Sequence, residues 1–191
     1  MSRDTVNPWV RTFLAIPLNT EIREALITLQ GKLARDWPEV RWTKPESLHL
    51  TLRFFGDLPE ECLEKIGEVM LSVKSFTAPF SASVRGIGAF PSLSRPRVIW
   101  AGVQGGQSLA ALFIRLEDGL ARIGLPREER PFTPHLTLGR CRTSSAGATQ
   151  ALNRYRLTDF GSLHIDRLIL YESRLGPGGA VHIPRRNVKL G

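Results

Sequence analysis

The tetrapeptide His-Leu-Thr-Leu occurs twice in this chain, at residues 49–52 and at residues 135–138. Residues two positions apart in a β-strand point to the same face, so each copy predicts a strand with a histidine and a threonine on one face. The leucines then point to the other face, where a hydrophobic core is expected. The chain must therefore fold so that two such strands bury their leucines and leave an imidazole and a hydroxyl accessible.

The sequence around the two copies also matches when the chain is shifted by 86 positions, which aligns Arg11 with Arg97 and His49 with His135. The spacing from each arginine to its histidine is 38 residues in both halves. This weak internal repeat has a period too long for a solenoid, so two lobes related by a pseudo-two-fold axis are the simpler interpretation. Such symmetry would bring the two histidines together across a central groove.

The composition limits the cellular location and the binding partners that we expect for this protein. Its 191 residues include 42% hydrophobic residues, enough for a core, but no apolar stretch reaches the roughly 18 residues that a membrane-spanning helix needs. The first residues lack a signal-peptide pattern, and the two cysteines lack metal-ligand spacing. We therefore expect a cytoplasmic protein with no membrane association. The net charge of +8 fits either a polyanionic partner such as nucleic acid or a basic, solvated surface.

Hydrophobic patterning predicts strands in alternation with helices. Short motif strands and a hairpin-like end favour an α+β fold over a doubly wound parallel sheet. We expect a bilobal pseudo-two-fold arrangement of two antiparallel-type sheets flanked by outer helices, with an active-site groove between the lobes. Residues 1–191 would form a single domain of two intertwined lobes, each carrying one motif. The expected strands are 11–17, 40–43, 47–55, 80–89, 97–103, 133–138 and 163–173, the expected helices are 20–34, 59–73, 108–123 and 145–155, and a turn at 176–179 leads into a closing hairpin.

The paired histidines point to phosphodiester chemistry. They lack the third protein ligand that catalytic zinc usually has, and no Gly-x-Ser-x-Gly sequence supports a serine nucleophile, so we expect no metal and no cofactor. A free imidazole titrates near pH ~6.5, so one ring can be neutral while the other is protonated. The neutral ring can deprotonate water, and the protonated ring can protonate a leaving oxygen. The threonine hydroxyls can hydrogen-bond the phosphate oxygens between them.

Residues 45–56 and 132–140 resemble the two signature stretches of the two-histidine (2H) phosphoesterases. Within that superfamily the chain is similar, over nearly its whole length, to the RNA 2′,3′-cyclic phosphodiesterases, also called 2′-5′ RNA ligases. The resemblance implies hydrolysis of RNA 2′,3′-cyclic phosphate ends to 2′-phosphates, with 2′-5′ ligation as the reverse reaction. It also implies that His49 is the proton donor, that His135 is the proton acceptor, and that Thr51 and Thr137 bind phosphate oxygens. The expected partner is RNA, tRNA fragments included. We expect the protein to act on it as a monomer, without an obligatory protein partner.

Five further residues are predicted to contact the RNA. Arg140 follows the second motif, where members of the family often carry a basic residue. Arg53 is four residues after the first motif histidine and would share its face of the strand. Arg130, in the loop before the second motif, would contact the RNA backbone, and Phe55 and Phe132 would stack on a terminal base. The alternatives are solvated charges for the arginines and core packing for the aromatic residues.

Two alternatives to this function follow from the same residues. The closer one keeps the fold and changes the substrate to 2′-5′ oligonucleotides or small cyclic nucleotides. The more distant one is a non-catalytic RNA-binding module that retains the groove. The remaining histidines, His164 and His182, lack a threonine two positions later and are interpreted as structural or surface residues.

Overall fold

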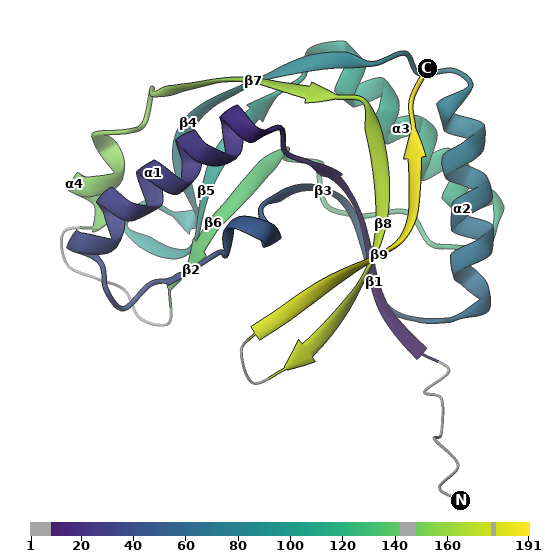
Figure 1. Cartoon of the computed structure of the whole chain (residues 1–191), viewed down its shortest axis with the longest axis horizontal. Helices are drawn as coiled ribbons and strands as arrows, with labels where there is room; N and C mark the ends of the chain where they lie inside the picture. Colours follow the sequence, from purple (N-terminus) through teal and green to yellow (C-terminus); the bar gives the residue numbers. More distant parts are fainter. Residues whose placement is uncertain (1–8, 142–147, 177–178) are drawn as a thin grey trace, which may run out of the picture.

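A computed structural model describes residues 9–141, 148–176 and 179–191 (Figure 1). The predicted helix start at 145–147 and the centre of the predicted turn, 177–178, lie outside these described residues. The elements in chain order are β1 Trp9–Pro17, α1 Thr20–Asp36, β2 Arg41–Trp42, the short 3-10 helix η1 Pro45–Ser47, β3 His49–Pro59, α2 Glu61–Lys74, β4 Phe80–Ser92, β5 Arg95–Gln104, α3 Gly106–Arg122, β6 His135–Arg140, α4 Ala148–Asn153, β7 Asp159–Ile165, β8 Arg167–Gly176 and β9 Gly179–Lys189.

The strands form an antiparallel sheet in the order β7-β4-β5-β6-β3-β1-β8-β9, with β2 added at β6. Counted outward from the central pair β3 and β6, each strand on one side has a counterpart on the other side. Helices α1 and α3 have equal lengths and begin 86 residues apart. The pseudo-two-fold axis passes between β3 and β6, where Leu50 pairs with Leu136. The α+β class and the pseudo-symmetry are confirmed, but the two expected sheets are halves of one continuous sheet because this central pair joins them.

The helices lie on the outer side of the curled sheet and cover its apolar face (Figure 1). Helix α1 packs against β7 and α4 against β4, whereas α2 packs on α3 and on β9 and β3 in the other half of the sheet, and α3 also contacts β4. The motif leucines, Leu50, Leu52, Leu136 and Leu138, are buried in this core, as the alternating pattern predicts. Burying each such side chain contributes about 1.5–3 kcal/mol. Because the leucines hold one face of each motif strand in the core, the opposite face of both strands is turned toward the groove.

The strand predicted at 163–173 is two strands. Leu163 and Ile165 belong to β7, which pairs with β4, whereas Leu168 and Leu170 belong to β8, which pairs with β1 in the other half of the sheet. The hydrophobic alternation changes phase between these two pairs of residues. The chain turns at Asp166, whose carboxylate accepts hydrogen bonds from the next residue, Arg167, at 2.9 Å. A phase change within an alternating segment thus marks the break that the prediction missed.

Candidate active site

The two motifs meet at the centre of the sheet. Because Leu50 pairs with Leu136 in an antiparallel register, continuing that register by one residue on each side places His49 opposite Thr137 and Thr51 opposite His135. Directly opposed residues in such a pair have Cβ atoms about 4.5–5.5 Å apart. Each imidazole therefore stands across from the hydroxyl-bearing residue of the other motif. A tetrahedral group bound at this centre can contact both motifs at once.

An open groove with a volume of about 500 Å³ contains this centre. Arg41, Lys44 and Arg140 contribute positive charge to it, and among the described residues no carboxylate lines it. The groove is therefore built for an anion. Its lining consists of Phe13, Arg41, Trp42, Thr43, Lys44, Ser47, His49, Thr51, Phe54, Thr137, Arg140, Ser173, Leu175, Gly176, Gly179, Ala180 and His182.

His49 is enclosed by other rings. It stacks on Phe13 with ring centroids 4.7 Å apart, and the ring of His182 meets it edge-on at 5.4 Å. The pKa of His49 is lowered to about 4, chiefly by burial and also by charge repulsion from His182 and, more weakly, from His135, while a hydrogen bond with the Ser47 backbone opposes the change. The ring is therefore neutral near pH 7 in the absence of an anionic ligand.

His135 has a different environment from His49, although the motifs are identical. Its ring meets the edge of Phe90 at 5.1 Å and lies 6.4 Å from the ring of Trp100. Its Nδ1 is 2.7 Å from the backbone oxygen of Thr133. A carbonyl oxygen only accepts hydrogen bonds, so Nδ1 carries the proton and the neutral ring keeps Nε2 free to accept one. The ring of His135 lies beside the groove rather than among the residues that line it.

A β-bulge in β3 turns Arg53 away from the groove. Ala15 pairs with Thr51, but the preceding residue, Leu14, pairs with Arg53, so Leu52 is an extra residue on β3. Paired residues share a face, and Leu14 is fully buried, so Arg53 points to the core side of the sheet. The prediction that Arg53 shares the face of the first motif is therefore wrong, because strict alternation does not continue through a bulge.

The same bulge moves the groove-facing aromatic position by one residue. Phe54 pairs with Phe13, and both line the groove, whereas Phe55 packs against the core. Phe55 was the predicted stacking residue, and the structure gives that position to Phe54. The strand also continues beyond its predicted end, because Gly56 adopts a φ of +74° that carries β3 through to Pro59.

A corresponding bulge in β6 brings Arg140 into the groove. Trp100 pairs with Thr137, and the register then shifts by one residue, so Leu138 is the extra residue on β6. The amide of Gln30, a buried side chain of α1, donates a hydrogen bond of 2.8 Å to the backbone oxygen of Leu138. Arg140 lies five residues after its motif histidine, as Phe54 does in the other half. The predicted placement of Arg140 at the groove agrees with the structure.

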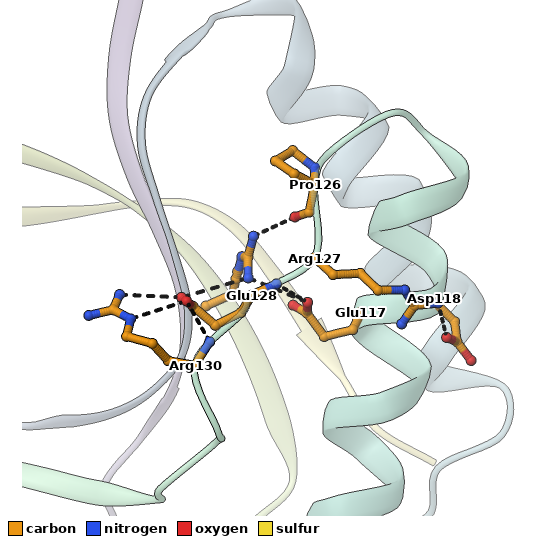
Figure 2. Close-up of polar contacts among 7 residues, drawn as sticks. Glu117, Asp118, Pro126, Arg127, Glu128 and Arg130 are labelled. Atoms are coloured by element: carbon orange, nitrogen blue, oxygen red, sulfur yellow. Dashed lines mark hydrogen bonds and ion pairs between the residues drawn. The ribbon is translucent and has the colours of Figure 1, made fainter.

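Arg53, which follows the bulge residue Leu52, joins a polar cluster on the far side of the sheet. Its side chain is only 10% exposed; it lies 3.4 Å from the carboxylate of Glu117 and 3.7 Å from that of Glu128, and it donates a hydrogen bond of 2.5 Å to the backbone oxygen of Pro126. Figure 2 shows Glu117 on α3 beside the loop that carries Pro126 and Glu128. Arg130 pairs with Glu128 and is otherwise exposed, away from the groove lining. The cluster therefore anchors the loop that precedes the second motif.

Two other predictions are corrected by the packing. Phe132 stacks on Phe113 with centroids 4.1 Å apart and packs against the core, so it does not reach the groove. His182, interpreted above as a structural or surface residue, lines the groove beside His49. It reaches this place because β9 pairs with β8, where Ser173 is its partner. The pairing of β8 with β9 confirms the predicted closing hairpin, but no pattern around His182 shows that β8 pairs in turn with β1, which carries Phe13 beside His49. His164 lies on an exposed position of β7, as predicted.

The low pKa of His49 makes stability depend on pH. The ring has an ordinary pKa of about 6.5 when the chain is unfolded, so between that value and 4 the unfolded chain binds a proton that the folded protein resists. The resulting stability is fully present above pH 6.5 and is lost as the pH falls toward 4. At about 1.4 kcal/mol per pKa unit, the loss is about 3 kcal/mol. Urea unfolding should show this extra loss in the wild type relative to His49→Asn, and parallel losses would contradict it.

Comparisons with known proteins agree with this geometry. The family described as LigT-like phosphoesterase matches residues 16–100 and 103–182, and each stretch contains one motif. An RNA 2′,3′-cyclic phosphodiesterase of Methanothermobacter thermautotrophicus is 32% identical over 175 residues, which cover 91% of this chain and 95% of that relative.

Solved structures show the same fold. A crystal structure of a Thermus thermophilus protein has a TM-score of 0.83 at 30% identity and covers 94% of this chain and 97% of that chain. The structure of Escherichia coli LigT complexed with 3′-AMP has a TM-score of 0.73 at 30% identity, over 95% of this chain and 98% of that chain.

Within the described ranges, no three histidine, cysteine or carboxylate side chains group as metal ligands, and no helix is long and apolar enough to cross a membrane. The paired motifs, the sheet that joins them and the match over most of the sequence establish that this chain belongs to the LigT-like phosphoesterase family.

Proposed function

We propose that this protein hydrolyses RNA 2′,3′-cyclic phosphate ends to 2′-phosphates. The observation that carries the proposal is the antiparallel pairing of Leu50 with Leu136, because this register puts each motif histidine opposite the threonine of the other motif. This centre lies in a basic groove whose described lining has no carboxylate. The similarity to an RNA 2′,3′-cyclic phosphodiesterase over 91% of the chain supports the same substrate class.

In the proposed reaction, His135 takes a proton from the attacking water through Nε2, and the water oxygen bonds to phosphorus. The bond between phosphorus and the 3′-oxygen breaks, and His49 protonates that oxygen. The hydroxyls of Thr51 and Thr137 hold the non-bridging oxygens. The hydrogen bond between Nδ1 of His135 and the backbone supports the role of His135 as base, because it leaves Nε2 as the free acceptor. With an RNA 5′-hydroxyl in place of water as the nucleophile, the same opening of the cyclic phosphate forms a 2′-5′ linkage.

The role of His49 as acid requires the substrate. Its pKa of about 4 keeps it neutral in the ligand-free groove, which by itself would suit a base. A bound phosphate places a negative charge next to the ring and so favours its protonated form. Substrate binding and protonation of His49 are thus coupled. We also propose that the enzyme is a single-domain monomer, because both motifs of the site come from the same chain. Its proposed substrates are RNA ends in the cytoplasm, tRNA fragments included.

An RNA oligonucleotide with a 2′,3′-cyclic phosphate end tests the proposal when it is incubated with the protein in EDTA. The expected product is an RNA with a 2′-phosphate and a free 3′-hydroxyl, identified by chromatography against both monophosphate standards. A 3′-phosphate product would reverse the regiochemistry. Absence of turnover with retained RNA binding would favour the binding-module alternative, and turnover of only small cyclic nucleotides would favour the other phosphodiesterase branch.

Replacing either motif threonine with valine tests phosphate binding. Thr51→Val and Thr137→Val keep the side-chain shape and remove one hydroxyl donor, so each is expected to lower kcat by about 10²-fold. Both side chains line the groove, so the fold should remain intact. Thr158→Val is the matched control, because Thr158 is partly buried and lies away from the groove. Unchanged turnover in both motif variants, or equal losses in all three, would argue against this role.

A further inference from the structure

One end of the groove carries three cations. Arg41 on β2 pairs in register with Arg140 on β6, and Lys44 follows just before η1. All three residues line the groove, and they come from two parts of the chain that are about 100 residues apart. The chain folds so that β2 adds to the outer edge of β6 beyond the second motif. This placement brings like charges together, which costs free energy unless an anion lies between them.

These cations differ from the other arginines around the site. Arg53 is paired with Glu117, and Arg174 and Arg185 are both paired with Glu172. In the part of the chain that the structure describes, Arg41, Lys44 and Arg140 have no carboxylate within ion-pair distance. Their positive charge is therefore available to a ligand, whereas the charge of the neighbouring arginines is already neutralised.

The backbone opposite Arg41 leaves room for its side chain. Gly179, at the start of β9, has a φ of +107°, and a Cβ atom at this position would collide with the guanidinium of Arg41. The guanidinium thus reaches across the groove to the β8–β9 hairpin. Because of the bulge at Leu138, Arg140 and Thr137 pair with Val98 and Trp100, which are two residues apart, so they are separated by roughly 7 Å along the strand. The cations are therefore displaced from the place where the motif threonines would hold the reacting phosphate.

We infer that Arg41 and Lys44, together with Arg140, bind a second phosphate of the substrate, namely the phosphodiester on the 5′ side of the terminal nucleotide. This inference rests on the proposed function. A 2′,3′-cyclic end has no nucleotide on its 3′ side, so the nearest other phosphate of an RNA substrate is the 5′ one. The guanidinium and ammonium groups provide charge-assisted hydrogen bonds to its oxygens. The subsite would make the enzyme prefer oligonucleotide ends to mononucleotides.

The smallest pair of substrates that tests the subsite is adenosine 2′,3′-cyclic phosphate with and without a 5′-phosphate. In the wild type, the 5′-phosphate is expected to raise kcat/KM by about tenfold or more, since a tenfold change needs only about 1.4 kcal/mol. In Arg41→Gln/Lys44→Gln this advantage should disappear, so that the ratio of kcat/KM between the two substrates falls to about one. Arg35→Gln/Lys32→Gln, on the exposed face of α1, removes the same charge away from the groove and should keep the advantage.

Three results would overturn the inference. The wild type could gain nothing from the 5′-phosphate, the groove variant could lose activity equally on both substrates, or the α1 control could lose the advantage as well. Failure of the proposed function is distinguishable, because the wild type would then hydrolyse neither compound. In that case, binding of adenosine 2′,5′-bisphosphate and adenosine 2′-monophosphate is compared by calorimetry. A preference for the bisphosphate that the groove variant lacks would support the subsite, and equal affinities would overturn it.

Discussion

His49→Asn and His135→Asn should each lower kcat/KM for a cyclic phosphate RNA end by about 10³-fold, because a general acid or base contributes about 10²–10⁴-fold to such a reaction. Asparagine keeps a polar side chain of similar reach but cannot transfer the proton. The two rings have different neighbours, yet the reaction needs both. Turnover is measured with a labelled oligonucleotide, and circular dichroism with thermal unfolding checks that each variant folds.

The control for this pair is His164→Asn, an exposed histidine on β7 outside the groove lining, which should keep wild-type activity. The double variant of the two motif histidines should be no slower than the slower single variant, since residues that act as a unit are not additive. A loss below tenfold in either folded single variant would contradict acid–base catalysis by these rings.

Glu117→Ala should lower the free energy of unfolding by about 3–5 kcal/mol, because it leaves the buried guanidinium of Arg53 without its closest carboxylate. The side chains of Glu117 and Arg53 are only 6% and 10% exposed. The same carboxylate oxygen also accepts a hydrogen bond of 2.8 Å from the backbone N–H of Glu128. Urea unfolding measures the change, and the loop drawn in Figure 2 should lose protection from hydrogen exchange.

The neighbouring residue supplies a matched control. Asp118 pairs with Arg127 at 2.6 Å, but both side chains are largely exposed, at 41% and 56%. Asp118→Ala should therefore cost no more than about 1 kcal/mol, because exposed ion pairs contribute little. Equal effects of the two substitutions would show that burial does not set the strength of the Arg53 cluster. Recovery of stability in Glu117→Leu/Arg53→Leu would locate the cost in the unpaired charge.

The sequence predicted the features that depend on regular periodicity. Leu50 and Leu136 lie in the core where period-two alternation puts them, and the repeat offset predicted the matching helices and the pseudo-two-fold axis. Alternation failed where a strand contains an extra residue. Alternation placed Arg53 and Phe55 on the groove side of the sheet. The bulge at Leu52 instead turns both side chains to the core side.

Features that depend on distant pairing left no local trace. His182 reaches His49 only because β8, the first strand of the predicted hairpin, pairs with β1, and Arg41 reaches the groove only because β2 adds to β6. Neither pairing follows from the residues around it. Phe132 looked available because it precedes a motif, but its flat stacking on Phe113 requires α3 to pass beside it. Sequence reasoning thus placed the motif residues better than the residues around them.

The assignment of acid and base is the central claim, and the low pKa of His49 gives it a specific test. The measurement is hydrolysis of an RNA end whose bridging 3′-oxygen is replaced by sulfur, compared with the ordinary end. A thiolate leaves without protonation, so it needs no general acid. His49→Asn should then be within about tenfold of the wild type on the sulfur substrate while remaining about 10³-fold slower on the oxygen one, and His135→Asn should be slow on both. Rescue of His135→Asn instead of His49→Asn would reverse the two roles and contradict the account.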